Sequence, residues 1–293
     1  DSDGKVRVVE DRCRIEGLGR GLDRTGRLSD DAIARTLDAV REFAQVIAAV
    51  RAERVAVVGT QALREAQNSD AFVGPAEVLL GSAIQVISGP REAELVFSAV
   101  RHSFPALVHG ELALFDVGGG STELVHARAG RIASLVSVPL GSVRLSERFL
   151  FTDPPTPDEA RALGEHIDRA LAQVAWLPLP AGTPLVGTAG TVTSLAAVAL
   201  ALSPYDPERV QGTRLSRATV LAQLARYLAQ TSVERARVVG LEPKRAPHIA
   251  AGAAIVAGVL ARTGAPELIV SDRGVRWGLA YELLGTNSRV EGE

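Results

Sequence analysis

LALFDVGGGSTELV, residues 112–125, is the most informative stretch of this 293-residue chain, because three consecutive glycines lie between two apolar runs. Each run predicts a strand. Asp116 and Glu123 flank the glycines. Glycine allows positive φ and lets successive backbone N–H groups approach an anion closely. By itself, the stretch is equally consistent with a phosphate-binding loop, beside carboxylates that hold a cation, and with a plain hairpin turn.

The chain before this stretch alternates strands and helices. Strands are predicted by KVRVVEDRCRI (5–15), RVAVVGT (54–60) and IQVISG (84–89). We expect one helix capped by Ser29, one that starts at Gln61 and is interrupted at Gly74-Pro75, and one with Pro90 in its first turn.

The chain after the glycines first predicts a meander and then alternates again. Two strands joined at Ala129-Gly130 precede a helix that a capping box starts at Thr156 and that runs to about Trp176. Later strands are expected at 183–190 and 267–272. One helix should follow the first of these strands directly, three more should start at Ser216, Thr231 and about Pro247, and a last one should cover 275–284. A unit of strands in a meander followed by alternating helices and strands thus occurs twice, with the opening strand missing from the first copy. This pattern predicts an α/β protein with a boundary near 105–111.

Composition narrows the class of protein. Hydrophobic residues make up 46% and charged residues 23% of the chain, as in soluble globular proteins. No apolar run reaches the roughly 20 residues that span a bilayer. The net charge of −2 gives no basic field for nucleic acid. Cys13 is the single cysteine, so no intrachain disulfide forms, which fits the cytoplasm.

A second glycine turn lies in VGTAGTVTSL, residues 186–195. A buried strand ends at Gly187-Thr188-Ala189-Gly190-Thr191 and a helix follows, whose N-terminus offers N–H groups to an anion. An ordinary strand-to-helix turn is the alternative. Because the two turns occupy matching places of two half-repeats, they could face each other across a cleft. The first turn is not a dinucleotide fingerprint, since a strand rather than a helix follows it.

Three more polar sites follow apolar strands, at the edge where open α/β sheets bind ligands. Thr60 ends a strand, and Arg64 lies one helical turn later, where it could grip phosphate or simply be solvated. Glu92, in the first turn of a helix, could activate a water, although a helix-dipole carboxylate is the more common reason for this position. Asp272-Arg273-Gly274 end the last strand, and the alternative to a ligand site here is a turn with a capping role.

Together these stretches resemble the exopolyphosphatase and guanosine pentaphosphate phosphohydrolase family, over about residues 1–285. The matching stretches, in order, are GTQALREAQN, ISGPREAE, FDVGGGSTELV, PLGSVRLSERF, VGTAGTVTSL, YDPERVQG, GLEPKRAPHIAAGAAI and SDRGVRWGL. The resemblance implies two actin-like (ribonuclease H-like) domains with a cleft between them. They would comprise residues 1–110, joined by the helix 275–285, and residues 111–274.

The resemblance also implies an activity, the Mg²⁺-assisted release of terminal phosphate from polyphosphate, guanosine pentaphosphate or both. Glu92 would activate water and Arg64 would hold phosphate, while Asp116 and Glu123 would lie near the metal. The phosphate loops would be residues 60, 118–122 and 187–191, that is Thr60, Gly118, Gly119, Gly120, Ser121, Thr122, Gly187, Thr188, Ala189, Gly190 and Thr191. A cytoplasmic homodimer that binds neither nucleic acid nor membranes is expected.

The chain departs from the family pattern in three places. The family's first strand and phosphate loop have no match, so we expect the natural N-terminus to lie further upstream. Arg91 replaces one of two adjacent carboxylates, which should make the site less repulsive to a polyanion. Trp277 stands where a glutamate is common. The chain otherwise resembles the short, two-domain form of the family.

The proposed reaction has two rivals. An actin-like kinase would need a nucleotide, so phosphate release from polyphosphate without nucleotide would exclude it. A catalytically weak binder or sensor of polyphosphate or guanosine pentaphosphate would bind tightly without turnover. The sequence leaves the choice between the two substrates open.

Overall fold

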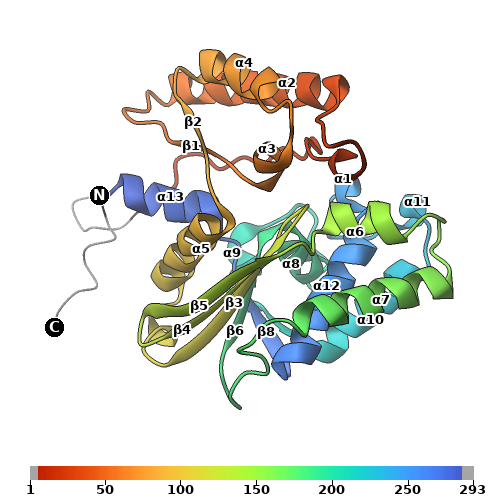
Figure 1. Cartoon of the computed structure of the whole chain (residues 1–293). Helices are drawn as coiled ribbons and strands as arrows, with labels where there is room; N and C mark the ends of the chain where they lie inside the picture. The colour runs from red at the N-terminus through yellow and green to blue at the C-terminus, as the bar shows by residue number, and fades with distance from the viewer. Residues whose placement is uncertain (1–5, 286–293) are drawn as a thin grey trace. The chain divides into compact units, whose positions relative to one another are not determined.

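The computed structural model describes residues 6–285 (Figure 1). The internal contacts of the chain divide it into two compact units, one ending at Val86 and the other beginning at Ile87. Both units combine helices with strands, so the predicted α/β class is confirmed. The predicted domains, residues 1–110 with helix 275–285 and residues 111–274, and the cleft between them stay predictions.

The first unit packs helices around a two-stranded parallel sheet. Val57–Gly59 (β1) pairs with Ile84–Val86 (β2). The helices of this unit are α1 (Leu22–Thr25), α2 (Asp30–Ala49), α3 (Gln61–Glu65) and α4 (Asp70–Leu80). The Ser29 hydroxyl accepts from the Ala32 amide, as the predicted N-cap requires. A small core includes Ile33, Leu63 and Phe72.

Two predictions for this unit are wrong. Residues 6–15 form no strand, because the alternating segment pairs with no other strand among residues 6–285, and a strand needs a partner for its backbone hydrogen bonds; Lys5 lies outside the described residues. Gly74-Pro75 does not interrupt a helix. The break comes earlier, at 66–69, and α4 runs through Pro75 because Phe72 and Ala76 are both buried.

The second unit is built on a sheet with the strand order β5-β4-β3-β6-β8-β7. Its strands are β3 (Glu111–Val117), β4 (Thr122–Arg128), β5 (Arg131–Val138), β6 (Leu185–Thr188), β7 (Arg214–Ser216) and β8 (Glu267–Val270). The first three form the predicted antiparallel meander, and β3, β6 and β8 are parallel. The predicted turn at Ala129-Gly130 is confirmed, with φ of 49° and 74°.

The predicted helices of this unit are present. They are α5 (Gly89–Ser103), α7 (Pro157–Leu171), α8 (Ala189–Ala199), α10 (Arg217–Leu228), α11 (Ser232–Arg235), α12 (Ile249–Thr263) and α13 (Val275–Leu283). Both sides of the Thr156 capping box form, although α7 ends before Trp176. The sequence did not predict β7, the short helix α9 (Pro207–Val210) or α6 (Ser142–Phe149).

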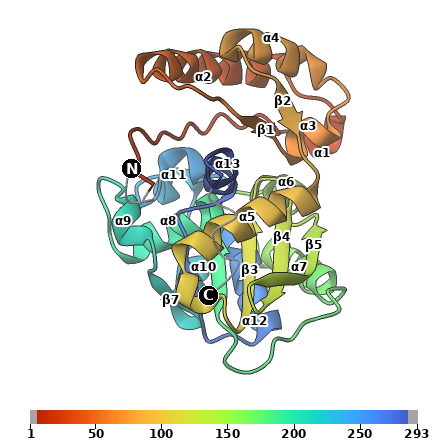
Figure 2. The same ribbon diagram turned by 90° about the vertical axis from the view of Figure 1, so that its left-hand side faces the viewer.

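One face of the sheet is covered by α5, with α13 packed on α5 (Figure 2). Leu112 and Leu114 of β3 and Val125 of β4 point toward α5 and meet Val96 and Val100 in one core cluster. Gly278 of α13 lies so close to the Leu95 carbonyl that any side chain there would overlap it. The two helices therefore touch backbone to backbone.

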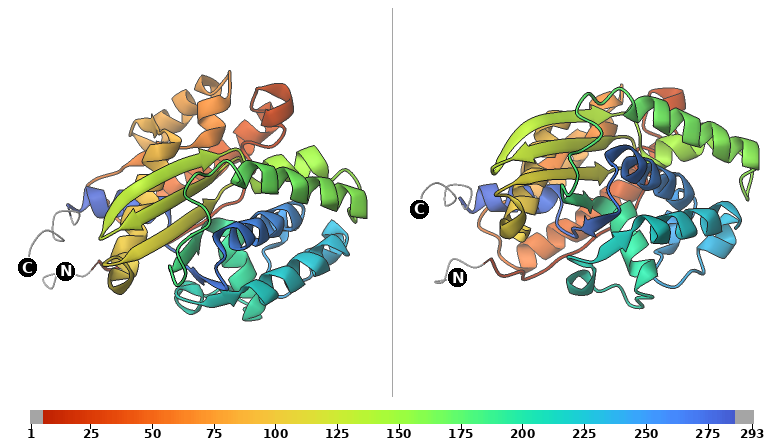
Figure 3. Two further views of the ribbon diagram at one scale, coloured as in Figure 1. Left: turned by 60° about the horizontal axis from the view of Figure 1, so that its bottom comes forward. Right: turned by 90° about the horizontal axis from the view of Figure 1, so that it is seen from below.

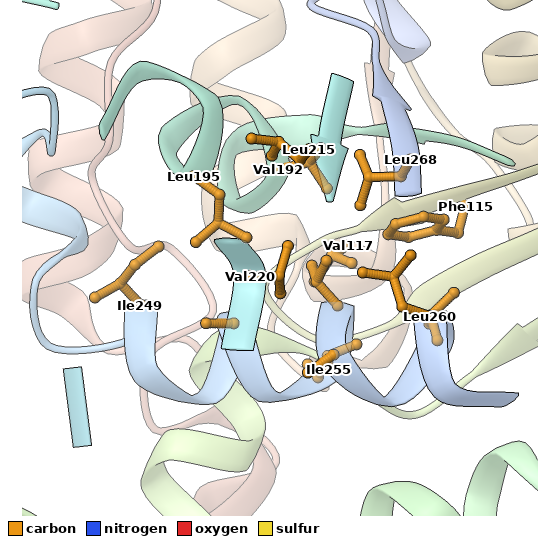
Figure 4. Packing of buried hydrophobic residues seen from close by; sticks show 14 of the residues in the cluster. Phe115, Val117, Val192, Leu195, Leu215, Val220, Ile249, Ile255, Leu260 and Leu268 are labelled. Carbon is orange, nitrogen blue, oxygen red and sulfur yellow. The ribbon is translucent and has the colours of Figure 1, made fainter. Parts of the chain in front are cut away.

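The other face carries the larger core. Phe115 and Val117 alternate with the residues that face α5 and pack against α8 and α12 (Figure 4). Helix α12 lies beside α7, as both views of Figure 3 show. Within residues 6–285, no helix combines the length and the apolar character needed to cross a membrane.

Candidate active site

Asp116 and Glu123 lie side by side at the end of the sheet where β3 finishes. They are direct partners in the antiparallel pairing of β3 with β4. Because side chains alternate along a strand, Asp116 shares the face of Leu114, and Glu123 that of Val125, which is the face covered by α5. Both carboxylates are buried, with 6% and 1% of the residue exposed.

Helix α5 brings a third carboxylate to the same place. The Ser88 hydroxyl caps the helix by accepting a hydrogen bond from the Arg91 amide, and Pro90 lies in the first turn, so the helix begins where the sequence predicts. Glu92, the residue after Arg91, is buried. Burial raises the pKa of Asp116 well above its ordinary value, and the charges of Glu123 and Glu92 raise it further. The structure therefore gathers all three predicted acidic residues into one cluster.

The first glycine turn is held from behind by α6. The amides of Val143 and Arg144 donate to the carbonyl of Gly119 at 2.9 and 3.0 Å, and the Ser142 amide donates to the carbonyl of Gly118 at 3.0 Å. In a trans peptide the N–H points away from the C=O. The amides of Gly119 and Gly120 therefore point away from α6, and within residues 6–285 they donate to no protein acceptor.

The glycines in this turn are needed for close approach rather than for positive φ. None of Gly118, Gly119 and Gly120 has a positive φ, so that part of the sequence argument is wrong. Gly141, which precedes α6, lies directly against the backbone of Gly119 and Gly120, and a side chain there would overlap both. The turn and the segment that precedes α6 therefore contact each other backbone to backbone.

The second glycine turn lies beside the first rather than opposite it. Thr188, at the end of β6, pairs with Asp116 across the parallel strands β3 and β6, so both turns leave the same edge of one sheet. The idea that they face each other is wrong because they belong to neighbouring strands. The Thr188 hydroxyl is buried and has no hydrogen-bond partner among the described residues. Helix α8 follows with no side-chain cap.

Arg245, which sequence reasoning did not single out, lies on this second turn. Its guanidinium occupies the space that a Cβ on Gly190 would fill. Within the described part of the chain no ion pair neutralises Arg245, so a positive charge lies on the open N-terminus of α8. The only sequence signal was its place in the motif GLEPKRAPHIAAGAAI, which sequence alone could not connect with a turn 55 residues earlier.

The loop after β8 completes the edge of the sheet. A Cβ on Gly274 would lie 3.3 Å from the Thr188 hydroxyl and 3.7 Å from a carboxylate oxygen of Asp116. The neighbouring Asp272 accepts a hydrogen bond from Tyr205, another residue that sequence reasoning missed, and burial raises the pKa of Asp272. Because Gly274 has no side chain, the space beside the Asp116 carboxylate and the Thr188 hydroxyl stays free of a Cβ.

Two of the three departures from the family pattern, Arg91 and Trp277, lie on helices α5 and α13. Arg91 forms ion pairs with Glu94 and with Glu282 of α13, so its charge links α5 to α13. The guanidinium of Arg273 lies 4.5 Å from the centre of the Trp277 ring, as a cation–π pair.

Thr60 and Arg64 belong to the first unit, at the start of α3. Their roles as substrate ligands stay predictions.

The whole sequence matches a known family. Residues 1–287 match the Ppx/GppA phosphatase family. The chain belongs to the Ppx/GppA phosphatase family. Another member, exopolyphosphatase 2 of Mycobacterium tuberculosis, is 35% identical over 295 residues, covering 96% of this chain and 91% of the relative.

Two further members of the Ppx/GppA family show the range of its names. The guanosine-5'-triphosphate,3'-diphosphate pyrophosphatase of Vibrio cholerae is 30% identical over 96% of this chain, which spans only 55% of that relative. The crystal structure of the Ppx/GppA family member from Aquifex aeolicus is 34% identical, with a TM-score of 0.80 over 97% of this chain and 92% of that one. The predicted family is therefore confirmed, and the chain has the fold of the Aquifex aeolicus family member.

Proposed function

We propose that this member of the Ppx/GppA phosphatase family is a hydrolase that releases terminal phosphate from inorganic polyphosphate, from guanosine pentaphosphate, or from both. One observation carries the proposal: two turns with outward amides lie side by side, at the edge of the sheet where three buried carboxylates meet. Amides and Arg245 suit the phosphate oxygens, while carboxylates suit a cation or a water. Two of the relatives named above are an exopolyphosphatase and a guanosine-5'-triphosphate,3'-diphosphate pyrophosphatase.

The reaction assigns a separate task to each part of the site. The amides of Gly119 and Gly120 and the N-terminus of α8 bind phosphate oxygens, and Arg245 offsets their charge. Glu92 orients a water for attack on the terminal phosphorus and accepts its proton. The bond from that phosphorus to the bridging oxygen breaks, and the electron pair leaves with the shortened chain.

Mg²⁺ is the cofactor that we propose, and the residues fit it. Asp116 and Glu123 offer carboxylate oxygens, and the Thr188 hydroxyl lacks a partner beside the space at Gly274. A cation would also offset the burial and the neighbouring negative charges that raise the pKa of Asp116. Residues 6–285 hold no group of three His, Cys, Asp or Glu placed to bind a metal, so the proposed site has only Asp116 and Glu123, and substrate phosphates would supply further ligands, as is usual for Mg²⁺. When bound, Mg²⁺ supplies positive charge to the phosphate oxygens.

The decisive experiment is phosphate release by the Glu92→Gln variant, measured on polyphosphate and guanosine pentaphosphate with Mg²⁺ and without nucleotide. Loss of the base should lower kcat by about 10²–10⁴-fold while the substrate still binds. Glu94→Gln is the matched control, because Glu94 lies on the same helix and pairs with Arg91 on its surface.

Three outcomes would contradict the proposal. Wild-type activity in Glu92→Gln would remove Glu92 from the mechanism. Tight binding by the wild-type protein without turnover would favour the sensor, and a strict need for a nucleotide would favour the kinase.

The same samples also test the proposed homodimer of a cytoplasmic protein. Sedimentation should give the mass of two chains, and binding assays should show no affinity for nucleic acid or lipid vesicles.

A further inference from the structure

Two serine hydroxyls converge on a single oxygen of Glu123. Ser121 donates to Oε1 of Glu123 at 2.8 Å, and Ser137 donates to the same atom at 2.7 Å. Ser121 belongs to the glycine turn, whereas Ser137 lies on β5 and belongs to none of the motifs recognised in the sequence. Glu123 is almost completely buried, with 1% exposed, and the Ser121 bond is buried with it, whereas the Ser137 bond is part-buried because Ser137 itself is exposed.

The sheet register explains why both hydroxyls reach this atom. Ser137 lies directly opposite Glu123 in the antiparallel pairing of β4 and β5, so both side chains stand on the face covered by α5. Ser121 precedes Glu123 by two residues and approaches from the turn. Two donors on one oxygen fix the plane of the carboxylate, because rotation of that plane would break both hydrogen bonds. The direction of Oε2 is then fixed as well.

Ser137 also touches the helix that carries Glu92. A Cβ on Gly89, the first residue of α5, would lie 2.8 Å from the Cβ and 3.0 Å from the hydroxyl of Ser137. The same Cβ would lie 3.8 Å from Oε1 of Glu123. Only a glycine lets α5 start this close to the sheet. Ser137 therefore contacts both the helix of the proposed general base and the carboxylate proposed to hold the metal.

We propose that Ser137 is a positioning residue, which orients Glu123 toward a divalent cation and sets the distance between α5 and that carboxylate. This role rests on the proposed hydrolase function and deepens it. Hydrogen-bonding partners of metal-ligating carboxylates tune metal affinity, and their loss typically costs 10–100-fold. Ser137 itself touches neither metal nor substrate, so its effect should appear first in metal binding.

The test compares Ser137→Ala with Ser134→Ala, a control on the same strand whose side chain stands on the opposite face. Mn²⁺ serves as the probe, and its binding to the complete chain without substrate is followed by the loss of the free-ion EPR signal. Ser137→Ala should weaken Mn²⁺ binding about tenfold and raise the half-saturating Mg²⁺ concentration for phosphate release by a similar factor. KM for polyphosphate at saturating Mg²⁺ and the melting temperature without metal should stay unchanged.

A second pair of variants separates the hydroxyl from the contact with α5. Gly89→Ala places a methyl group against Ser137 and should weaken both metal binding and kcat. Adding Ser137→Gly makes room for that methyl group but removes the hydroxyl. The double variant should therefore recover kcat while it keeps the weak metal binding of Ser137→Ala; a double variant as slow as Gly89→Ala would refute the contact.

The outcomes also separate this role from the hydrolase function itself. Unchanged Mn²⁺ binding in Ser137→Ala, with an active wild-type enzyme, would overturn the positioning role alone. A fall in melting temperature without a change in metal affinity would do the same, because it would mark Ser137 as a structural residue. A wild-type chain that releases no phosphate at any Mg²⁺ concentration would instead overturn the proposed function.

Discussion

The two glycine turns of the second unit have similar sequences but obtain their outward amides in different ways. In the first turn, residues 118–121, the carbonyls bond to the start of α6, and this contact turns the amides of Gly119 and Gly120 outward. In the second turn, residues 187–191, the open amides are those of the first turn of α8, which any uncapped helix leaves unpaired. Its one residue with positive φ is Ala189, at 70°, and not a glycine.

The difference shows that a run of glycines does not disclose its own purpose. The first turn depends on a third segment, Gly141–Arg144, which lies some 20 residues away in the sequence. The second turn depends only on the helix that follows it, and Gly190 is small so that Arg245 can lie there. Damage to the partner segment should therefore harm the first turn more than the second.

The largest effect is expected from Gly141→Ala, which breaks the support of the first turn. Its Cβ would overlap the backbone of Gly119 and Gly120, and backbone cannot move aside as a flexible side chain can. We expect a loss of roughly 3 kcal/mol in unfolding free energy, together with loss of phosphate release. Urea unfolding and steady-state kinetics measure the two. Gly164→Ala in α7 is the control, since a Cβ there meets nothing within 4 Å and should be neutral or slightly stabilising.

A smaller effect is expected from Gly190→Ala, which disturbs the second turn. The added methyl group meets only the end of the Arg245 side chain, which can swing away. Stability should hardly change, while KM for the phosphate chain should rise about tenfold, the loss of one charge-assisted contact. The double variant with Arg245→Ala should be no worse than Arg245→Ala alone. Additive effects would show that Gly190 acts independently of Arg245.

The last effect concerns only the stability of the metal-free protein and comes from Asp116, the buried carboxyl that precedes the first turn and pairs with the uncharged Thr188 of the second. Burial and like charges raise the pKa of Asp116 in the native state, whereas the unfolded chain keeps the ordinary value. Between these two pKa values the native state binds more protons, so the stability of the metal-free protein falls as pH rises from about 4. Below that range both states are protonated and Asp116 has no effect.

Asp116→Asn removes this loss, so the metal-free variant should match the wild type near pH 4 and exceed it at pH 8. The expected result at pH 8 is a higher melting temperature for the variant than for the wild type, because the variant carries no buried charge at this position. Thermal unfolding in the presence of a chelator measures it, with the surface variant Glu94→Gln as a control. A gain that does not change with pH would contradict the role of the charge. Mg²⁺ should narrow the difference by stabilising the wild type.

The sequence predicted those parts of the fold that depend on local pattern. The meander at 111–138, the capping box at Thr156 and the start of α5 all follow from periodicity, turn residues and caps, and all are present. Period 2 groups Asp116 with Leu114 and Glu123 with Val125, but only the pairing register places both carboxylates on one face. The strand predicted at 5–15 failed because a strand needs a partner, and local alternation cannot supply one.

The parts that escaped prediction depend on contacts between distant segments. Arg245, Tyr205 and Ser137 reach the edge of the site from a 3₁₀ turn, a loop and an outer strand, and none stands beside a recognised glycine turn in the sequence. Helix α6 was missed although its motif was recognised, because its start is fixed by carbonyls of the glycine turn rather than by a capping side chain. Only tertiary structure reveals such partners.

The hydrogen bonds from α6 into the first turn also have an electronic consequence. The start of a helix carries partial positive charge, and here it is applied to the carbonyl oxygens of Gly118 and Gly119. Each of these peptide groups is conjugated, so electron density drawn toward its oxygen is withdrawn from its nitrogen and makes the N–H more acidic. The turn thus relays the field of α6 through two peptide bonds, and Gly119 and Gly120 become stronger donors than an ordinary hairpin would offer. Helix α6 can in this way act by induction on an anion that accepts hydrogen bonds from these two amides.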